Sequence, residues 1–448
     1  MNVKSVLKAA LFAAALLVLL SVTVDISVAE NATDVPKFVS IKGAGGHTLA
    51  IDEDGMVWAW GHNEEGCVGT NQVDDQSDTV VRQPVMVEGL SNVTVIDCFF
   101  ADSMALRDDG TVWMWGGSSA NFKNNSVGLH VPVQVPGLSR IKQIVCGQWC
   151  GIALKDDGTV WAWGSNERGY LGSGTKVSGY YYTTPVQVPG IAHIKLITSN
   201  GGTMFAVKDD DTVWAWGAAS HPALIGWKGF GRSLYTTTPI HVASLPDVIS
   251  IAANLEELYL VTGSGEVWKM GYGSNESLIP DRVQSLQDIS TIRSGYNHTV
   301  ALGHDGSVYT WGENDHGQIG DGTTTNRLTP YKVSIPHTKA VFTGYSQTFA
   351  IDENGDLWGW GRDEIGQLGD EGGLDRTLPV KILFSKSNVS TPVAHDSTPT
   401  SASQPLVSMA EDMSAVSSPG FGLNTITLLG CLLITAGLLS GFCRREDR

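Results

Sequence analysis

The sequence is poor in positive charge. Lys and Arg number 29 against 46 Asp and Glu, and the formal net charge of the 448 residues is −17. Proteins that hold nucleic acid by its phosphates need clustered cations, so the lack of any long Lys/Arg run argues against nucleic-acid binding. The chain also lacks a Gly-x-Ser-x-Gly nucleophile elbow, a His-Glu-x-x-His zinc motif and a phosphate-binding loop. No linear motif therefore predicts an enzyme, a metal or a cofactor.

Both ends have the patterns of export and membrane attachment. Lys4 and Lys8 precede an apolar run and a small-residue cleavage site at Ala29, so residues 1–29 are predicted to be a signal peptide. An uncleaved N-terminal anchor is the alternative. Residues 423–442 carry no charge and precede an Arg-rich tip, which predicts a membrane-spanning helix with a cytoplasmic end. We expect a protein of the cell surface, exported and anchored in the cytoplasmic membrane with its body outside.

The segment before this span is too polar to form a core. Residues 385–418 are rich in Ser, Thr and Pro and are predicted to be a stalk. Residues 419–448 begin with Pro-Gly-Phe, continue into the apolar span and end in the basic tip, which resembles the sorting signal of archaeal surface proteins, where a membrane sortase removes the anchor. A retained helix is the alternative. Exposed N-glycosylation sites are expected at Asn31, Asn124 and Asn388.

What the sequence has in abundance is Gly and Trp, with 52 and 14 residues. Twelve of the Trp residues belong to a motif of the form Trp-x-Trp-Gly or a close variant. The motif occurs seven times and closes on Gly61, Gly116, Gly164, Gly217, Gly271, Gly312 and Gly361. The first and last of these glycines are 300 residues apart, a mean period of 50, which indicates a repeat architecture.

The residue pattern of each repeat predicts four short strands. An apolar segment, an Asp/Gly turn and the Trp strand form a hairpin, and a later strand is expected to begin at a proline. These prolines are Pro84, Pro132, Pro185, Pro239, Pro280, Pro330 and Pro379. A four-stranded blade cannot bury both faces alone, so seven blades must pack in a ring. The predicted fold is all-β, a seven-bladed β-propeller over residues 30–384 that carries the acidic charge: residues 30–418 sum to −19, because each terminal segment has a net charge of +1.

The units resemble the regulator of chromosome condensation repeat family. The match is best at residues 295–302, Asp305-Gly306, Trp311-Gly312 and the Gly-Gln-Ile-Gly-Asp-Gly loop of residues 317–322, and residues 366–370 match nearly as well. The second, fourth and fifth units depart from the pattern, because their Gly-Gln-Leu-Gly loop is lost. The resemblance implies the propeller fold for all seven units.

Function does not follow from the fold. The founding nuclear members of the family exchange nucleotide on a small GTPase and contact chromatin through basic extensions. An acidic, exported chain without a basic arm does not fit that role. Secreted relatives, among them a bacterial propeller that inhibits β-lactamases, are a better analogy because they bind proteins through one rim. We expect a non-catalytic module that binds an extracellular protein or glycan and meets the membrane through its C-terminal segment.

Aligning the units places seven polar or thiol residues in one column at the start of the second strand: His47, Asp102, Cys150, Thr203, Glu257, His298 and Gln347. Their simplest role is to satisfy hydrogen bonds between blades. The alternative function, a surface polysaccharide hydrolase or lyase, would use Asp102, Glu257 and His298 at the channel. A metal site would need these ligands to converge on one ion, and seven blades spread them apart.

The segments just before this column carry aromatic residues, which often anchor partners or sugars when exposed. The candidate binding residues are Phe99, Phe100, Trp149, Tyr296 and Tyr345, with Tyr181 and Trp227 from longer insertions. Packing within the channel mouth is the alternative. The acidic turns between strands, such as residues 52–55, lack the ligand series of a calcium loop and are expected to be hairpin turns.

Four cysteines lie between the terminal segments: Cys67, Cys98, Cys146 and Cys150. An exported location permits disulfides. Cys146 and Cys150 flank a short connection and are the favoured pair, with free buried thiols as the alternative.

Overall fold

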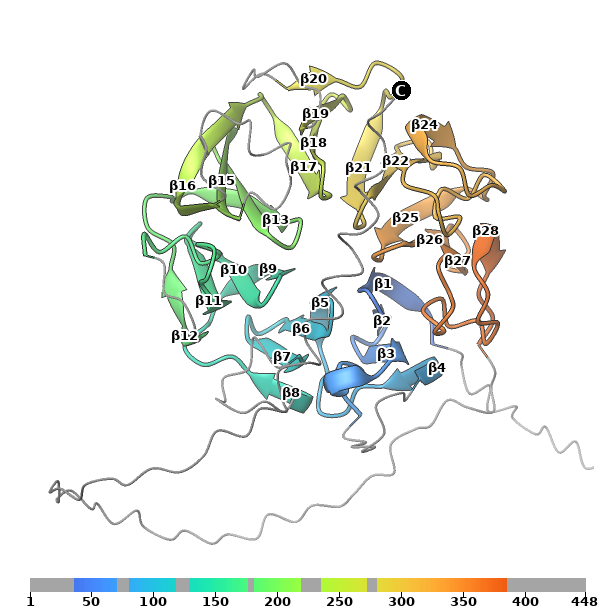
Figure 1. Cartoon of the computed structure of the whole chain (residues 1–448), viewed down its shortest axis with the longest axis horizontal. Coiled ribbons are helices and arrows are strands. Elements are labelled where there is room, and N and C mark those ends of the chain that lie inside the picture. The colour runs from blue at the N-terminus through green and yellow to red at the C-terminus, as the bar shows by residue number, and fades with distance from the viewer. Residues whose placement is uncertain are drawn as a thin grey trace, which may run out of the picture. The chain divides into compact units, whose positions relative to one another are not determined.

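The computed structural model describes residues 36–70, 80–117, 129–175, 181–218, 235–271 and 280–384. All of them fall within one unit, residues 1–393, and none lies in the second, residues 394–448. They form seven four-stranded antiparallel sheets, each made of four consecutive strands (Figure 1). The predicted seven-bladed all-β propeller is therefore confirmed. In the described ranges no helix is long and apolar enough to cross a membrane.

The first two strands of each blade form the inner half of the ring. The first strands are β1 (Phe38–Gly43), β5 (Val93–Phe99), β9 (Ile141–Gly147), β13 (Ile194–Ser199), β17 (Val248–Ala253), β21 (Ile289–Ser294) and β25 (Thr338–Thr343). The second strands are β2 (His47–Asp52), β6 (Asp102–Arg107), β10 (Cys150–Lys155), β14 (Thr203–Lys208), β18 (Glu257–Thr262), β22 (His298–Gly303) and β26 (Gln347–Asp352). Contacts between neighbouring first strands run round the ring and close it between β25 and β1.

The Trp motifs form the third strands, and the proline segments form the fourth. The third strands are β3 (Val57–His62), β7 (Val112–Gly116), β11 (Val160–Ser165), β15 (Thr212–Ala218), β19 (Val267–Gly271), β23 (Val308–Gly312) and β27 (Leu357–Gly361). The fourth strands are β4 (Val80–Met86), β8 (Leu129–Gln134), β12 (Tyr181–Gln187), β16 (Tyr235–Ser244), β20 (Asp281–Arg282), β24 (Arg327–Lys332) and β28 (Arg376–Lys381). One 3-10 helix, η1 (Glu64–Gly66), follows β3.

The prediction that a proline begins each fourth strand is wrong for six blades. In β4, for example, Pro84 lies inside the strand, and only β20 starts directly after its proline. The register of β3 with β4 shifts between Ala59 and Gly61, close to Pro84. A proline is tolerated there because the fourth strand is the edge of its sheet and has no further strand to receive its N–H.

The acidic turns act as hairpin turns, as expected. In blade 1 the Asp52 carboxylate accepts the backbone N–H of Met56 at 2.8 Å and the indole N–H of Trp58 at 2.7 Å. The glycine that closes each Trp motif faces the first residue of the second strand, as Gly61 faces His47. A Cβ at Gly61 would lie 2.8 Å from the Cα of His47, and the backbone of Gly61 has a φ of +100°. Only glycine fits this position without strain.

Seven apolar cores lie between neighbouring blades, and each draws side chains from two of them. The second Trp of the motif lies at the centre of these joints, and Trp60, Trp115, Trp163, Trp216 and Trp360 are fully buried. A blade thus buries its faces against its neighbours, as the repeat pattern required.

Four blades carry a seven-residue loop after the third strand, which we name the latch loop: residues 63–69, 166–172, 314–320 and 363–369. Its first residue, Asn or Asp, accepts the N–H of the sixth residue, as Asn314 does from Ile319 at 2.9 Å. This bond curls the loop so that its fifth residue, Gln318 in blade 6, directs a carbonyl towards the next blade.

That carbonyl accepts the indole N–H of the second Trp of the next blade. The four bonds are Trp115 to Cys67 (2.9 Å), Trp216 to Tyr170 (3.0 Å), Trp360 to Gln318 (2.9 Å) and Trp60 to Gln367 (2.8 Å). The last of these joins blade 7 to blade 1 and closes the ring. At that joint Phe38 also packs edge-on against Phe384, with ring centroids 5.4 Å apart.

The three joints without a described latch loop use other partners. Trp163 donates to the sulfur of Met114 at 3.4 Å, and Trp311 donates to the hydroxyl of Tyr259 at 2.8 Å. Blade 5 has Met270 where the other blades have the second Trp, so this position offers no indole N–H. At the joints where no latch loop is described, the second Trp has a different acceptor or is replaced by Met270.

The indole bond can be tested by comparing two buried Trp residues. Trp216→Phe leaves the Tyr170 carbonyl without its indole donor, whereas Trp163→Phe removes a bond to a thioether, which is a weak acceptor. We expect Trp216→Phe to lower the free energy of unfolding by about 1–2 kcal/mol more than Trp163→Phe. Urea denaturation of both variants measures this difference, and equal losses would show that ring packing alone holds the joints.

The latch loop of blade 7 begins with a different residue type from the other three latch loops. Asp363 stands where blades 1, 3 and 6 have Asn, and its side chain is fully buried. In blade 6 the Asn314 amide donates to Asp321 at 3.3 Å, while in blade 7 Asp363 faces the Asp370 carboxylate, which is bound by Arg376 at 2.6 Å. Burial and the neighbouring Asp370 raise the pKa of Asp363. A protonated Asp363 would donate to Asp370 as the Asn314 amide donates to Asp321.

A raised folded-state pKa means that stability is lost as the pH rises above the ordinary carboxyl range. Asp363→Asn supplies the donor permanently, so we expect it to raise the thermal unfolding midpoint at pH 8 and to change it little at pH 5. Asp315→Asn, at an exposed position in the blade 6 latch loop, is the control. A variant of Asp363 that is less stable than the parent at both pH values would contradict the shared proton.

Candidate functional site

The seven polar or thiol residues that the alignment placed in one column, from His47 to Gln347, occupy equivalent positions in the structure. All seven residues begin the second strands, directly opposite the closing glycines of the Trp motifs. Six of them are buried, and Glu257 is half-buried. Two column residues bond side chains of the next blade: the Nε2 atom of His47 lies 2.8 Å from the Ser103 hydroxyl, and that of His298 lies 3.0 Å from the Thr348 hydroxyl. Burial lowers the pKa of both histidines to about 4, so they are neutral links between blades.

The three residues of the hydrolase alternative are not brought together. Burial, with a smaller contribution from Glu65, raises the pKa of Asp102 to about 7, which would suit a general acid. Asp102 is buried in blade 2, however, and Glu257 in blade 5 is bound by Lys269 at 2.5 Å. Neither carboxylate, nor His298, lines the central cavity. Among the described residues, the paired carboxylates that glycoside hydrolysis needs are not assembled at the channel.

Four of the predicted aromatic residues form one cluster, which we name the aromatic mouth: Phe99, Phe100, Tyr296 and Tyr345. Tyr296 stacks on Tyr345 with ring centroids 3.9 Å apart, and Phe100 lies 6.3 Å from Tyr345 and 4.8 Å from Phe99. All four line one end of the cavity inside the ring of first strands. Their connections are held by backbone bonds, such as Tyr296 N–H to Tyr345 C=O at 2.9 Å.

The rings meet across blade 1 because its equivalent residue is small. Phe100 belongs to blade 2 and Tyr345 to blade 7, and a Cβ at Gly45 of blade 1 would lie 4.0 Å from both rings. Phe99 reaches in the other direction and covers Gly201 of blade 4. Burial, with the neighbouring Tyr296 hydroxyl, raises the pKa of the Tyr345 phenol, which therefore stays neutral.

Two further candidates are exposed on the same face as the aromatic mouth. The Trp149 carbonyl accepts the Ser165 N–H at 2.8 Å, and Ser165 pairs with Tyr181 at the start of β12. Trp149 is 40% exposed, Tyr181 45% and Phe100 47%. Trp149 and Phe100 also have positive φ values, +63° and +51°, which bulky residues rarely adopt. Trp227 lies outside the described residues.

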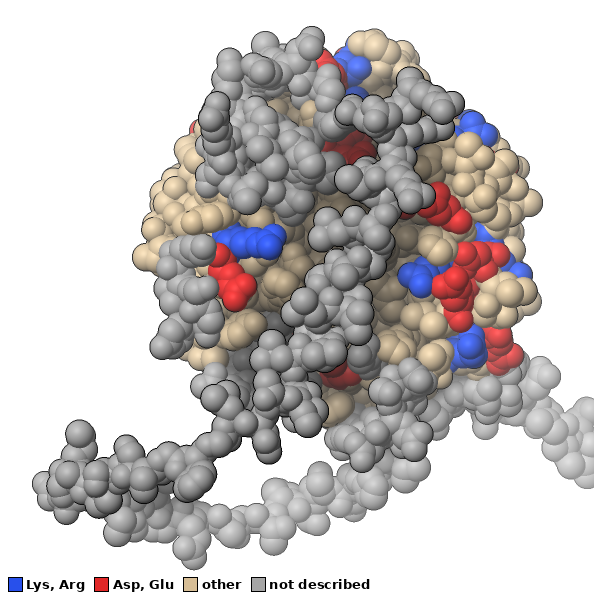
Figure 2. Space-filling model, in the orientation of Figure 1, with Lys and Arg blue, Asp and Glu red and all other residues tan. Residues whose placement is uncertain are grey.

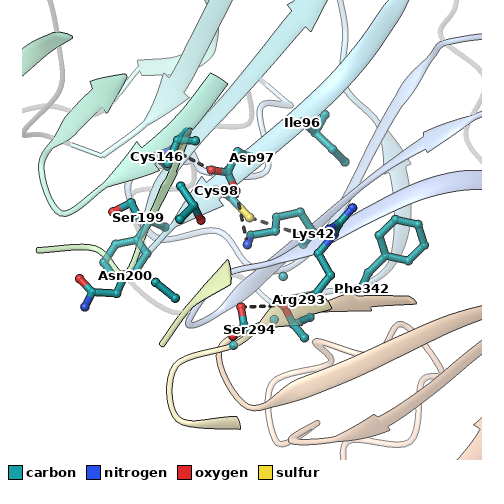
Figure 3. A pocket seen from close by; sticks show the side chains of 18 of the residues that line it. Lys42, Ile96, Asp97, Cys98, Cys146, Ser199, Asn200, Arg293, Ser294 and Phe342 are labelled. Carbon is teal, nitrogen blue, oxygen red and sulfur yellow. Dashed lines mark hydrogen bonds and ion pairs between the residues drawn. The ribbon is translucent and has the colours of Figure 1, made fainter. Parts of the chain in front are cut away.

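The cavity behind the aromatic mouth has a volume of about 450 Å³ and is lined by all seven first strands. Lys42 and Asp97 form an ion pair across blades 1 and 2 at 3.5 Å, and Asp97 also accepts the backbone N–H of Cys146 at 2.7 Å (Figure 3). The Cys98 thiol donates to the Lys42 carbonyl at 3.4 Å. The cavity is therefore polar on the side of blades 1 to 3.

The predicted Cys146–Cys150 disulfide is wrong: both residues are free thiols. Across the β9–β10 hairpin, Cys150 pairs with Gly147, so Cys146 is one position out of register. Successive residues of a strand point to opposite faces, and the two thiols enter different cores, that of blades 2 and 3 for Cys146 and that of blades 3 and 4 for Cys150. Cys98 is also a free thiol, and the Cys67 thiol donates to the His62 carbonyl at 3.0 Å.

The sequence did not single out one ligand-type cluster at the joint of blades 6 and 7. His316, Glu364 and Asp375 have ligand-type atoms within 4.8 Å of one another. The His316 ring bonds Asp375 at 2.7 Å, and Glu364 is bound by Arg362 at 2.8 Å. His316 and Glu364 belong to two successive latch loops, a placement that the repeat alignment could have shown. The bond between His316 and Asp375 links blades 6 and 7, whereas Arg362 and Glu364 both belong to blade 7.

Comparison with known proteins agrees with this architecture. Two models of the Regulator of chromosome condensation (RCC1) repeat match the chain, one at residues 54–105, 157–207 and 305–351 and the other at residues 39–67, 141–169 and 289–318. The crystal structure of human WBSCR16 has the same fold, with a TM-score of 0.59 and 23% identity over 69% of this chain and 86% of that one. The protein is a seven-bladed β-propeller that contains RCC1 repeats at the matched residues.

Relatives with this repeat are diverse. The chain is 28% identical to the Ultraviolet-B receptor UVR8 of Arabidopsis thaliana over 69% of its own length and 72% of the receptor's. It is 26% identical to the E3 ubiquitin-protein ligase HERC2 of Mus musculus over 66% of this chain, and the match spans 5% of HERC2. It is 24% identical to Protein RCC1 of Candida albicans over 62% of this chain and 72% of that protein.

The thiols provide a direct test of the corrected cysteine assignment. Burial raises the pKa of Cys98, Cys146 and Cys150, and only the thiolate reacts quickly. We expect all three to resist alkylation at pH 8 in the folded protein and to react at once in denaturant, as mapped by peptide mass spectrometry without reductant. If Cys146 stays unmodified in denaturant until a reductant is added, Cys146 forms a disulfide and its assignment as a free thiol is wrong.

Proposed function

We propose that the protein is an exported, non-catalytic binding module that presents its propeller at the cell surface. Residues 1–29 serve as the signal peptide, residues 385–418 as the stalk and residues 419–448 as the membrane anchor, with the sorting-signal pattern as its processing site. These segments lie outside the described residues, as do the proposed glycosylation sites Asn31, Asn124 and Asn388. The partner is an extracellular protein or glycan that contacts the face of the aromatic mouth.

The observation that carries this proposal is the exposure and the backbone conformation of Phe100 and Trp149. Each is a large aromatic residue, 40% or more exposed, in a left-handed backbone conformation. Such a conformation costs about 1–2 kcal/mol for a residue with a side chain, and neither ring recovers that energy by full burial. Backbone strain combined with exposed aromatic surface is typical of residues that act in recognition rather than in folding.

The charge distribution supports a partner other than nucleic acid. On the face seen in Figure 2, the described Lys and Arg residues lie in small groups next to Asp and Glu, not as a continuous basic surface. Among the described residues, several cations are held in ion pairs, such as Arg327 with Asp321 and Arg376 with Asp370. A phosphate backbone would find few unpaired cations there.

The name of one relative fits the same class. UVR8, which the chain matches over 72% of the relative's length, is a receptor by name. A protein similar to this chain is therefore named as a receptor, in that case of ultraviolet-B.

The proposal predicts that the two strained rings are needed for capture of the partner. Phe100→Ala and Trp149→Ala together are expected to lower apparent affinity at least about 10-fold, as two interface hot spots would. Binding is measured with the immobilised full chain against the envelope fraction of the producing organism and against a panel of purified glycans. The unfolding midpoint should not fall, since neither ring is buried.

Leu383→Ala is the matched control. Leu383 is 72% exposed and follows Ile382, whose N–H bonds Leu357 at the end of blade 7 opposite the aromatic mouth. This variant should bind like the parent. Equal capture by the parent and the double variant would reject this face as the binding surface.

A further inference from the structure

The channel contains a layer of seven residues at one height. In every blade the same position of the first strand pairs with the third residue of the second strand, as Lys42 pairs with Leu49 and Arg293 with Val300. The seven residues of this layer are Lys42, Asp97, Val145, Thr198, Ala252, Arg293 and Phe342. All except Ala252 line the cavity, and Figure 3 shows Lys42, Asp97, Arg293 and Phe342 around it.

The layer contains three ionised side chains, Lys42, Asp97 and Arg293, and their charges do not sum to zero. Lys42 is neutralised by Asp97, so the net charge of the cavity lining is the single positive charge of Arg293. Arg293 makes two hydrogen bonds, both through Nη1, to the Thr291 hydroxyl at 2.8 Å and the Ile292 carbonyl at 3.0 Å. Among the described residues no carboxylate pairs with it. Its Nε and Nη2 atoms remain available as donors.

This cation occupies an unfavourable place for an unpaired charge. The Arg293 side chain meets the water of the channel, but protein surrounds it, and the resulting desolvation lowers its pKa. A partly desolvated charge without a counterion costs free energy, which an anionic ligand would recover. The planar guanidinium fork matches the two oxygens of a carboxylate or phosphate group.

The rest of the cavity suits an organic body. Its volume of about 450 Å³ is in the usual range for small-molecule sites, roughly 300–1,000 Å³. Ser40 and Thr198 also line it, and their hydroxyls make no hydrogen bond to another described residue. Phe342 on the neighbouring blade supplies an apolar surface at the same height as Arg293.

We propose that the channel binds a small organic anion, of about the size of a monosaccharide, whose carboxylate or phosphate group is held by Arg293. The hydroxyls of Ser40 and Thr198 would bond polar groups of its body. Arg293 belongs to a strand inside the ring, whereas the aromatic mouth lines one end of the same cavity, so this proposal uses neither Phe100 nor Trp149.

The test uses the full chain and four probes: glucuronate, glucose 6-phosphate, inorganic phosphate and neutral glucose. Calorimetric titration should show binding of at least one of the two sugar anions, more weakly of inorganic phosphate and not of glucose. The two anions distinguish a carboxylate site from a phosphate site. Arg293→Gln should raise the Kd of the bound anion about 10- to 100-fold, the effect of losing a charge-assisted pair.

Lys339→Gln is the matched control, because Lys339 is an exposed cation on β25 that does not line the cavity. The unfolding midpoint without ligand checks the fold: because Arg293 has no carboxylate partner among the described residues and bonds only to its neighbours Thr291 and Ile292, its removal should change that midpoint little. The proposal is overturned if neither sugar anion binds, if inorganic phosphate binds as tightly as both, or if Arg293→Gln binds like the parent. These results do not depend on Phe100 and Trp149, so failure here leaves the surface proposal untouched.

Discussion

The hydrogen bond from an indole N–H to the carbonyl of a latch loop is the interaction on which the ring depends. The bond joins a motif of one blade to a loop of the blade before it, as between Trp360 and Gln318. It satisfies two polar groups inside an apolar joint, where an unpaired carbonyl would be costly. At three of these joints a hydroxyl from the second strand donates to the same carbonyl, as Thr348 does to Gln318. The Gly-Gln-Leu-Gly pattern is therefore part of the joint, and blade 5, which follows a blade whose sequence lacks this pattern, has Met270 in place of the Trp.

The repeat made most of the fold predictable from sequence. Seven Trp motifs with Asp/Gly turns were enough to predict seven blades and to place the column from His47 to Gln347 at its actual position. The error at Cys146 and Cys150 came from judging proximity along the chain, when the alternation of side chains in a strand decides which face each thiol enters. The starts of the fourth strands were misplaced because proline was treated as a strand boundary, whereas an edge strand tolerates it inside.

Candidate site residues were harder to predict because their neighbours are remote in sequence. The aromatic mouth joins blades 2, 6 and 7, and Phe100 and Tyr345 come together because blade 1 has Gly45 between them. Arg293 was missed for a related reason. Nothing in the local sequence distinguishes Arg293 from other arginines. Its role becomes visible only when the seven residues of its layer are compared, because the layer has two cations and one carboxylate.

Every described sheet consists of four consecutive strands, and no blade is completed by a strand from elsewhere in the described chain. The joint between blades 7 and 1 therefore uses the same chemistry as the joint between blades 6 and 7, with Trp60, Thr48 and Gln367 in the places of Trp360, Thr348 and Gln318. In mechanical terms the ring has no first or last blade. A load applied to the closing joint meets the same set of bonds as a load applied to the joint between blades 6 and 7, so the closing joint is not inherently the weakest point of the circle.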